Sequence, residues 1–275
     1  PAKRPRHFSV TQVQKLIGDP YAFYAREILK LEPLKPVGAA NDAAERGTLI
    51  HDAIDLFTKR HPGPLGQNAL ENLLACGAEK FAQAASDKEL HGFWWPQFKR
   101  IAAWFVEEER KLRADVATQI TETRGQQGFK VEGEDYTLSA RADRIDLLED
   151  GTARILDYKT GQVPSAAAVA DGRAPQLPLE AWLLQNGGFA DAGAHAAASL
   201  VYMRLSGGET PGEIKQAAKD MGGLADESFQ GFCQLLKDYA RQTQAYLPLP
   251  DETRFADYDH LARYAEWIAQ LSGDA

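Results

Sequence analysis

The spacing of apolar residues changes near residue 118, and this change constrains the fold more than any other feature of the chain. Residues 118–124 and 128–160 alternate between apolar and polar residues, as strands with one buried face do. Elsewhere apolar residues recur at helical spacing. This spacing predicts helices over residues 8–31, from near Asp42, and over 68–85, 93–117 and 176–186. A further strand is expected at 197–205, and the remainder is predicted to be mostly helical.

Helices that bracket a short run of strands predict an α/β fold. We expect one domain over residues 1–275, with a small central mixed sheet flanked by helices and with helical additions at both ends. The catalytic core is expected over about 40–205 and a helical part over about 212–275. Ser9 is the predicted N-cap of the first helix, which Asp19-Pro20 interrupts. The chain does not begin with Met, so we expect it to be a fragment of a longer protein.

Composition limits the classes of function. A formal net charge of -8 argues against a protein that coats nucleic acid, although metal-binding carboxylates would also make a chain acidic. Cys76 and Cys233 are the only cysteines, too few for a disulfide framework or a four-thiolate cluster within this chain. No apolar run approaches the ~20 residues that cross a bilayer, and no signal peptide is evident. We therefore predict a cytoplasmic protein with no membrane contact.

The strongest chemical signal is Ile155-Leu-Asp157-Tyr-Lys159-Thr-Gly161. Asp157 and Lys159 are two residues apart on a predicted strand, so their side chains emerge on the same side. A carboxylate that holds a hard cation, beside an ammonium that orients water or neutralises phosphate, suits phosphodiester hydrolysis. Taken alone, a surface ion pair on a strand is an equally good interpretation.

Asp143 is the second candidate, within Ala140-Arg-Ala-Asp143-Arg-Ile-Asp146 on the preceding strand. A two-residue turn at Asp150-Gly151 would place Asp143 opposite Tyr158 and on the wrong face from Asp157. Sharing a metal ion therefore requires a bulge or a three-residue loop. We predict such an irregularity, with Gly151 in a left-handed conformation as one way to supply it.

Two helices carry the remaining candidates. Gly47 precedes His51 by one helical turn, so both lie on the same face. Glycine inside a helix costs ~1 kcal/mol relative to alanine, which predicts that a strand, DNA or a metal ion comes close to the helix beside His51, a candidate imidazole ligand. Gln176 and Glu180 lie one turn apart on the predicted helix 176–186. Gln176 is expected to hydrogen-bond Lys159 or a phosphate oxygen, whereas for Glu180 a polar stripe on an amphipathic helix is the favoured interpretation.

In this order the four motifs resemble the RecB-like branch of the PD-(D/E)XK nuclease superfamily. That branch carries G-x-x-x-H, G-x-x-D-R-I-D, D-Y-K and Q-x-x-x-Y. Here they stand as Gly47…His51, Ala140…Asp146, Asp157-Tyr158-Lys159 and Gln176…Glu180. The segments Phe8-Ser-Val-Thr11, Asp19-Pro-Tyr-Ala-Phe-Tyr24 and Pro175…Trp182 are similar to the C-terminal nuclease domains of the AddB family, subunits of bacterial AddAB helicase–nucleases.

The resemblance implies a set of roles. His51, Asp143, Asp157 and the carbonyl of Tyr158 would bind Mg²⁺, which Mn²⁺ can replace, and Lys159 and Gln176 would serve catalysis. Arg141, Arg144 and Gln176 would touch phosphate or order the site. The substrate would be single-stranded DNA fed by a helicase, with a partner subunit of AddA type, in double-strand-break repair and recombination.

Two departures from the family pattern matter. Glu180 stands where the pattern has Tyr. Some AddB-type nucleases join their ends through an iron–sulfur cluster, but Gly18-Asp19 stands at the expected position and the C-terminal region has no cysteine trio. We expect no cluster, and direct packing of the C-terminal helices on the first helix.

Two other functions remain open at this stage. One is a catalytically silent DNA-binding scaffold within a helicase–nuclease complex. The other is a free-standing restriction-type endonuclease, for which no basic recognition helix is evident.

Overall fold

The computed structural model describes residues 4–33, 42–84, 88–218, 221–241, 243–248 and 258–263. Six strands in this part form one mixed sheet in the order β1-β3-β4-β5-β6, with β2 paired to β3. The strands are β1 (His7–Ser9), β2 (Val116–Val131), β3 (Glu134–Leu148), β4 (Ala153–Lys159), β5 (Ala197–Leu205) and β6 (Gly212–Gln216). The predicted α/β class is confirmed, with the β1–β3 and β4–β5 pairs parallel and the other pairs antiparallel.

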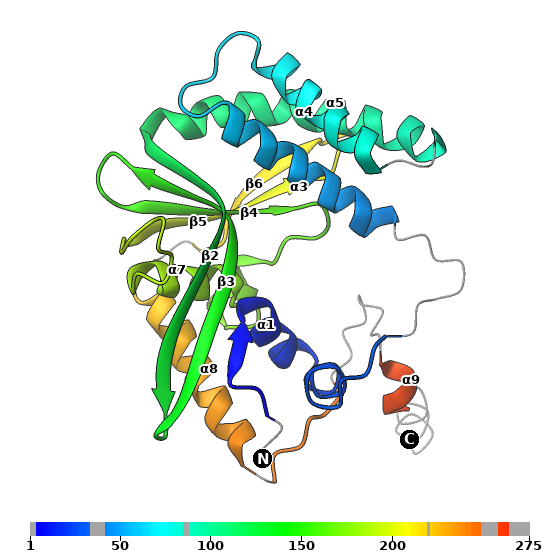
Figure 1. Ribbon diagram of the computed structural model, residues 1–275. Coiled ribbons are helices and arrows are strands. Elements are labelled where there is room, and N and C mark those ends of the chain that lie inside the picture. The colour runs from blue at the N-terminus through cyan, green and yellow to red at the C-terminus, as the bar shows by residue number, and fades with distance from the viewer. Residues whose placement is uncertain are drawn as a thin grey trace.

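Helices cover both faces of the sheet (Figure 1). One face is covered by α3 (Asp42–Arg60), α4 (Ala69–Ala84) and α5 (Lys88–Leu112), and the other by α1 (Val10–Gly18), α7 (Gln176–Gln185) and α8 (Leu224–Ala240). Shorter elements are α2 (Pro20–Phe23), the π-helix η1 (Tyr24–Ile28), the 3₁₀ turn η2 (Arg113–Asp115), α6 (Ala166–Ala170) and α9 (Asp259–Ala262). None of the described helices combines the length and apolarity that a membrane span needs.

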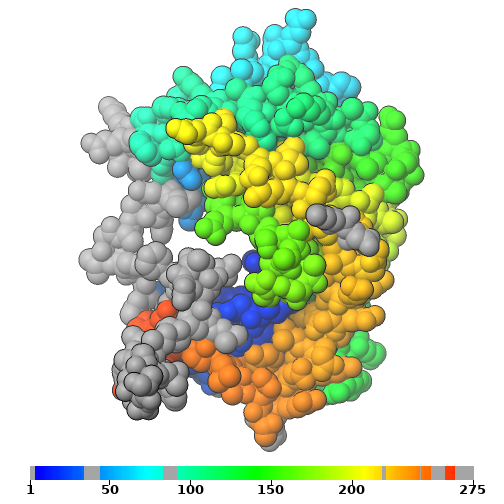
Figure 2. All heavy atoms as spheres, turned by 180° about the vertical axis from the view of Figure 1, so that it is seen from behind, coloured from blue at the N-terminus to red at the C-terminus, as the bar shows by residue number. Residues whose placement is uncertain are grey.

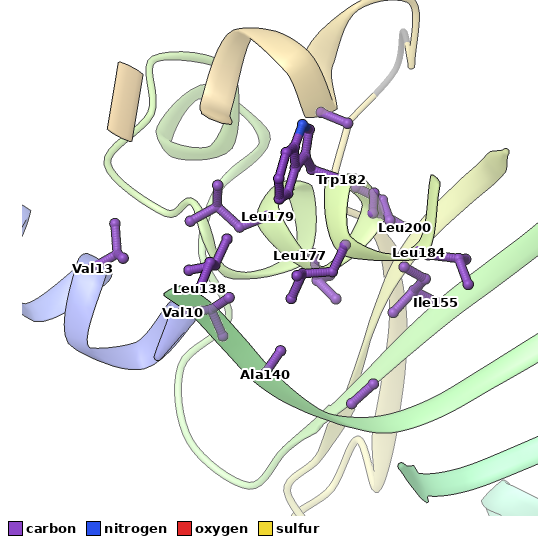
Figure 3. Close-up of a cluster of buried hydrophobic side chains, with 14 of the residues drawn as sticks. Val10, Val13, Leu138, Ala140, Ile155, Leu177, Leu179, Trp182, Leu184 and Leu200 are labelled. Carbon is purple, nitrogen blue, oxygen red and sulfur yellow. The ribbon is translucent and has the colours of Figure 1, made fainter. Parts of the chain in front are cut away.

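The two cores explain why β4 and β5 read as apolar runs. Ile155 and Leu200 face the core beneath α7, whereas Leu156 and Val201 face the core beneath α3 and α5. Figure 3 shows the first core, where α7 side chains such as Leu177 meet the sheet and α1. Strands buried on both faces hold their ends rigidly, which suits a site built at the C-terminal end of β4.

The turn between β3 and β4 has the irregularity that the sequence predicted. Leu148 and Thr152 are bonded across a three-residue loop, and the loop ends in Gly151 with φ +83°. The register pairs Arg144 with Leu156 and Ile145 with Ile155. Continued by one residue, it sets Asp143 beside Asp157, so the two acids meet as a shared site requires.

One edge of β3 is shared by two strands. β1 pairs with its residues 137–139 and β4 with its residues 144–147, which leaves a gap between them at this edge. Asp143 lies in that gap, and its carboxylate Oδ2 accepts the Tyr158 backbone N–H at 2.9 Å. The sheet therefore opens at the position where the sequence places its acidic residues.

Two expectations are corrected. Residues 212–216 form strand β6 instead of helix, because they pair antiparallel with β5 and complete the sheet edge. The predicted strands 118–124 and 128–160 are β2, β3 and β4, and β2 runs unbroken through its glycines. Gly125 is needed inside the strand, since a Cβ there would lie 2.5 Å from the ring of Phe189.

The expected packing of the C-terminal part on the predicted helix 8–31 is seen, since α8 and Tyr258 both contact this segment. Ser9 caps α1 in a capping box with Gln12, as the sequence indicates. Phe8 packs edge-on against Phe232 of α8, and the Tyr258 hydroxyl donates to the Leu31 carbonyl at 2.6 Å. Figure 2 shows the molecule from behind, hollowed between the half that carries α4 and α5 and the half that carries α1 and α8.

Candidate active site

Asp157 lies near the end of β4 and is almost entirely buried. The Lys159 ammonium lies 2.7 Å from its Oδ2 and 3.0 Å from its Oδ1, as expected for residues two apart on one strand. Its Oδ2 accepts no hydrogen bond in the described structure and faces Lys159 only as an ion pair. Both oxygens of this carboxylate therefore lie beside the positive charge of Lys159.

Gln176, the first residue of α7, joins these two groups. Its Nε2 donates to Asp157 Oδ1 at 2.6 Å, and its Oε1 accepts from Lys159 Nζ at 3.1 Å. The bond to Lys159 is the one expected from the sequence. One amide therefore fixes the orientation of both the carboxylate and the ammonium.

His51 reaches the site from α3. Its Nδ1 lies 3.7 Å from Asp143 Oδ2, and its ring meets the Tyr158 ring edge-on. Gly47, one turn earlier, has the close neighbour that the sequence predicted, since a Cβ there would lie 2.9 Å from the Thr160 hydroxyl. The missing side chain thus allows α3 to approach the loop that follows Lys159.

The pKa values of the site report crowded, buried charges. Burial and the neighbouring Asp157 raise the pKa of Asp143 to about 7, against the opposing effect of the Tyr158 N–H. Burial lowers the pKa of His51, so this imidazole is neutral and free to act as a ligand. The site holds more negative charge than its one ammonium neutralises, which favours a bound cation.

Asp143 opens onto a surface pocket of about 370 Å³ between α3 and the β2–β3 hairpin. Asp143, His51 and Thr160 line it, together with Glu122 and Arg141. The Arg141 side chain is 61% exposed and pairs with Glu122 at 2.5 Å. Arg141 therefore lies where the sequence expected it to meet substrate, whereas the acid beside it had not been singled out.

Arg144 does not lie where a phosphate contact would need it. Its side chain is fully buried, and it bonds both oxygens of Glu109 and both oxygens of Asp146. Its Nη1 also lies 3.5 Å from the Tyr158 hydroxyl. These buried acidic partners hold the guanidinium away from the surface, so the expected phosphate contact is replaced by a structural role beneath the site.

Glu180 is the site residue that sequence reasoning missed. We expected a polar stripe on an amphipathic helix, but α7 is buried on all sides and Glu180 is 1% exposed. Its Oε1 accepts from Gln176 Nε2 at 3.3 Å. Burial, with Asp157 and Asp143 close by, raises the pKa of Glu180 well above its ordinary value. The signal in the sequence was the apolar residues on every side of this helix.

A model of the PD-(D/E)XK nuclease superfamily matches residues 7–260, which include every candidate described above. The chain belongs to this superfamily. An uncharacterized protein of Rickettsia bellii is 23% identical over 270 residues, which cover 94% of this chain and 32% of that protein. An uncharacterized protein of Rickettsia conorii is 28% identical over 192 residues, 67% of this chain and 23% of that protein. The chain thus spans about a third or less of these relatives.

Among solved structures, this nuclease-superfamily chain matches that of SSO0001 with a TM-score of 0.42 and 12% identity, over 94% of this chain and 86% of the other. The superfamily is generally one of nucleases that use divalent metal ions, which is the chemistry that the site's residues suggest.

The donor set fits such an ion. Asp143 and Asp157 offer hard carboxylate oxygens, and His51 offers a neutral nitrogen. Within the described ranges, no three acidic, histidine or cysteine side chains are already gathered as a metal cage. Without a bound ion, the Lys159 ammonium balances the charge of Asp157.

Proposed function

We propose that this chain is a Mg²⁺-dependent deoxyribonuclease, with Mn²⁺ able to replace Mg²⁺, which hydrolyses phosphodiester bonds of single-stranded DNA. The observation that supports this most is the convergence of Asp143, Asp157, Lys159 and His51 from a helix and two strands, beside an open pocket that Asp143 and His51 line. Asp157 lies behind this pocket, with its Oδ2 2.7 Å from the Lys159 ammonium. The pocket leaves room for a substrate group beside the acids.

The chemistry divides among the residues. A cation held by Asp143, Asp157, His51 and the carbonyl of Tyr158 would polarise the phosphate and make bound water more acidic. Lys159 neutralises the charge that develops on the phosphate oxygens. Gln176 holds Lys159 and Asp157 in register, so that the ammonium remains beside the reacting phosphate.

We further propose that a helicase delivers the strand and that an AddA-type partner subunit is present. Cutting is then exonucleolytic, and the reaction serves double-strand-break repair and recombination in the cytoplasm. An acidic chain repels DNA, so a tethered motor would supply the local substrate concentration. The much greater length of the Rickettsia relatives leaves room for such a motor or a docking region in the same polypeptide.

The test is cleavage of an end-labelled single-stranded oligonucleotide with Mg²⁺, Mn²⁺ or EDTA, with and without the partner subunit. We expect metal-dependent products from the wild type and none from Asp157→Ala or Lys159→Ala. Asp171→Ala is the matched control, since that aspartate is exposed and pairs only with Arg173 among the described residues. No cleavage under any condition would replace the proposal with a silent DNA-binding scaffold.

A further inference from the structure

The β2–β3 hairpin extends beyond β4 as an arm with two different faces. One face, with Leu138, Ala140 and Ala142, is buried against the core that includes α7 and α8. The other face is polar and lies on the side of Asp143. It carries Glu122, Arg124, Gln126, Thr137, Ser139 and Arg141. Figure 1 shows α8 behind this arm, and Figure 2, from the opposite side, shows α8 in front. The polar face leads directly to the acids.

Arg124 and Arg141 are direct partners across the two strands of the arm. Like charges directly opposite each other destabilise an antiparallel pair, so this arrangement works against the stability of the fold. Glu122 neutralises Arg141, but Arg124 is exposed and has no ion pair or side-chain hydrogen bond within the described residues. One positive charge of the pair is therefore uncompensated.

The distance from this pair to the candidate site suits a polymeric substrate. Arg141 precedes Asp143 by two residues on the same face, which is about 7 Å along a strand. A phosphate next to the one at Asp143 and Asp157 would lie beside the two guanidinium groups. Beyond them, Gln126 is exposed and offers a neutral amide to the continuing chain, whereas the hydroxyl of its cross-strand partner Ser139 is bonded to His7.

We propose that Arg124 and Arg141 bind the phosphate adjacent to the one being cut, and that the polar face of the arm guides the single strand at the site. This rests on the proposed function for the identity of the polymer. Arginine is suited to the role because its fork of N–H donors can bridge Glu122 and a phosphate oxygen together.

The experiment measures binding apart from cleavage. Fluorescence anisotropy in EDTA follows a labelled single-stranded oligonucleotide with the full-length protein, the Arg124→Ala variant and Lys130→Ala. Lys130 is the matched control, because it is exposed on the same face of β2 and is already paired with Asp135. We expect Arg124→Ala to weaken binding several-fold. Its plot of log K against log salt should be shallower by about 0.7, as for one lost phosphate contact on a single strand.

A second oligonucleotide series replaces one phosphate at a time with a neutral methylphosphonate. One position should weaken wild-type binding and leave Arg124→Ala binding unchanged, which identifies the partner phosphate. The melting temperature of Arg124→Ala should equal or exceed that of the wild type, since a like-charge pair is removed.

Three results would overturn the inference: equal losses for Arg124→Ala and Lys130→Ala, unchanged binding in Arg124→Ala, or wild-type protein that does not bind single strands. A wild type that binds through Arg124 but never cuts with metal would refute the proposed function and leave this inference standing.

Discussion

Replacing Arg144 with leucine should destabilise the whole domain, although Arg144 lies next to a candidate catalytic residue. Its guanidinium contacts both oxygens of Glu109 at 2.7 Å and those of Asp146 at 2.6 and 2.8 Å, and all three side chains are fully buried. Removing one partner from a buried pair costs about 3–5 kcal/mol. Arg113 still bonds Glu109 and Arg154 still bonds Asp146 in the variant. We therefore expect a loss of unfolding free energy within that range, although two acids lose a partner.

The assay is equilibrium unfolding in urea, followed by circular dichroism. A loss of 3–5 kcal/mol corresponds to a midpoint lowered by about 1–2 M for a protein of this size. Arg141→Leu is the control, since Arg141 is exposed and its single ion pair, with Glu122, is worth about 1 kcal/mol or less. The reasoning fails if Arg144→Leu unfolds at the wild-type midpoint and instead weakens DNA binding, because that pattern belongs to a phosphate contact.

Three further predictions concern stability and pH. Gly77→Ala should destabilise the protein by about 1–3 kcal/mol despite alanine's better helix propensity, because a Cβ would lie 2.0 Å from the ring of Phe98; a higher melting temperature would contradict this. Burial alone would raise the pKa of Glu109, but the charges of Arg144 and Arg113 outweigh it and hold the pKa below the ordinary 4.5. This carboxylate therefore stabilises the fold fully above about pH 4.5 and loses its contribution as the pH falls further. In a plot of melting temperature against pH, Glu109→Gln should fall less steeply at acid pH than the wild type. An equally steep fall would contradict this role of Glu109. The pKa of Asp143 is raised to about 7, so the metal-free fold loses stability as the pH rises through 7. Asp143→Asn should therefore melt higher than wild type at pH 8, with a smaller difference at pH 5, and it should not cut DNA. A lower melting temperature of this variant at pH 8 would contradict the burial argument.

Local rules predicted much of the fold and of the site. The N-cap at Ser9, the helix beginning at Asp42 and the strand 197–205 follow from residue type and spacing alone. The alternation of side chains along strands made a more specific prediction, because it required an irregular turn between Asp143 and Asp157. The three-residue loop that ends in Gly151 is that turn. The contact between Lys159 and Gln176 also follows from placing each on its element.

What the sequence did not reveal depends on neighbours distant in the chain. Strand β6 is short and weakly patterned, and it forms because β5 offers an unpaired edge. Gly125 reads as a break until Phe189 is seen to occupy the space of its side chain. Glu180 reads as surface until α7 is found buried on every side. Arg144 reads as a substrate contact until Glu109 of α5 is found beside it.

The central claim is that Asp143 and Asp157 share one divalent cation with His51. Anomalous diffraction from a crystal soaked in Mn²⁺ tests it most directly. The account predicts a peak within bonding distance of a carboxylate oxygen of each aspartate and of a His51 ring nitrogen, with Lys159 remaining close by. A peak bound elsewhere, or no peak at Mn²⁺ concentrations that support cleavage, would contradict it.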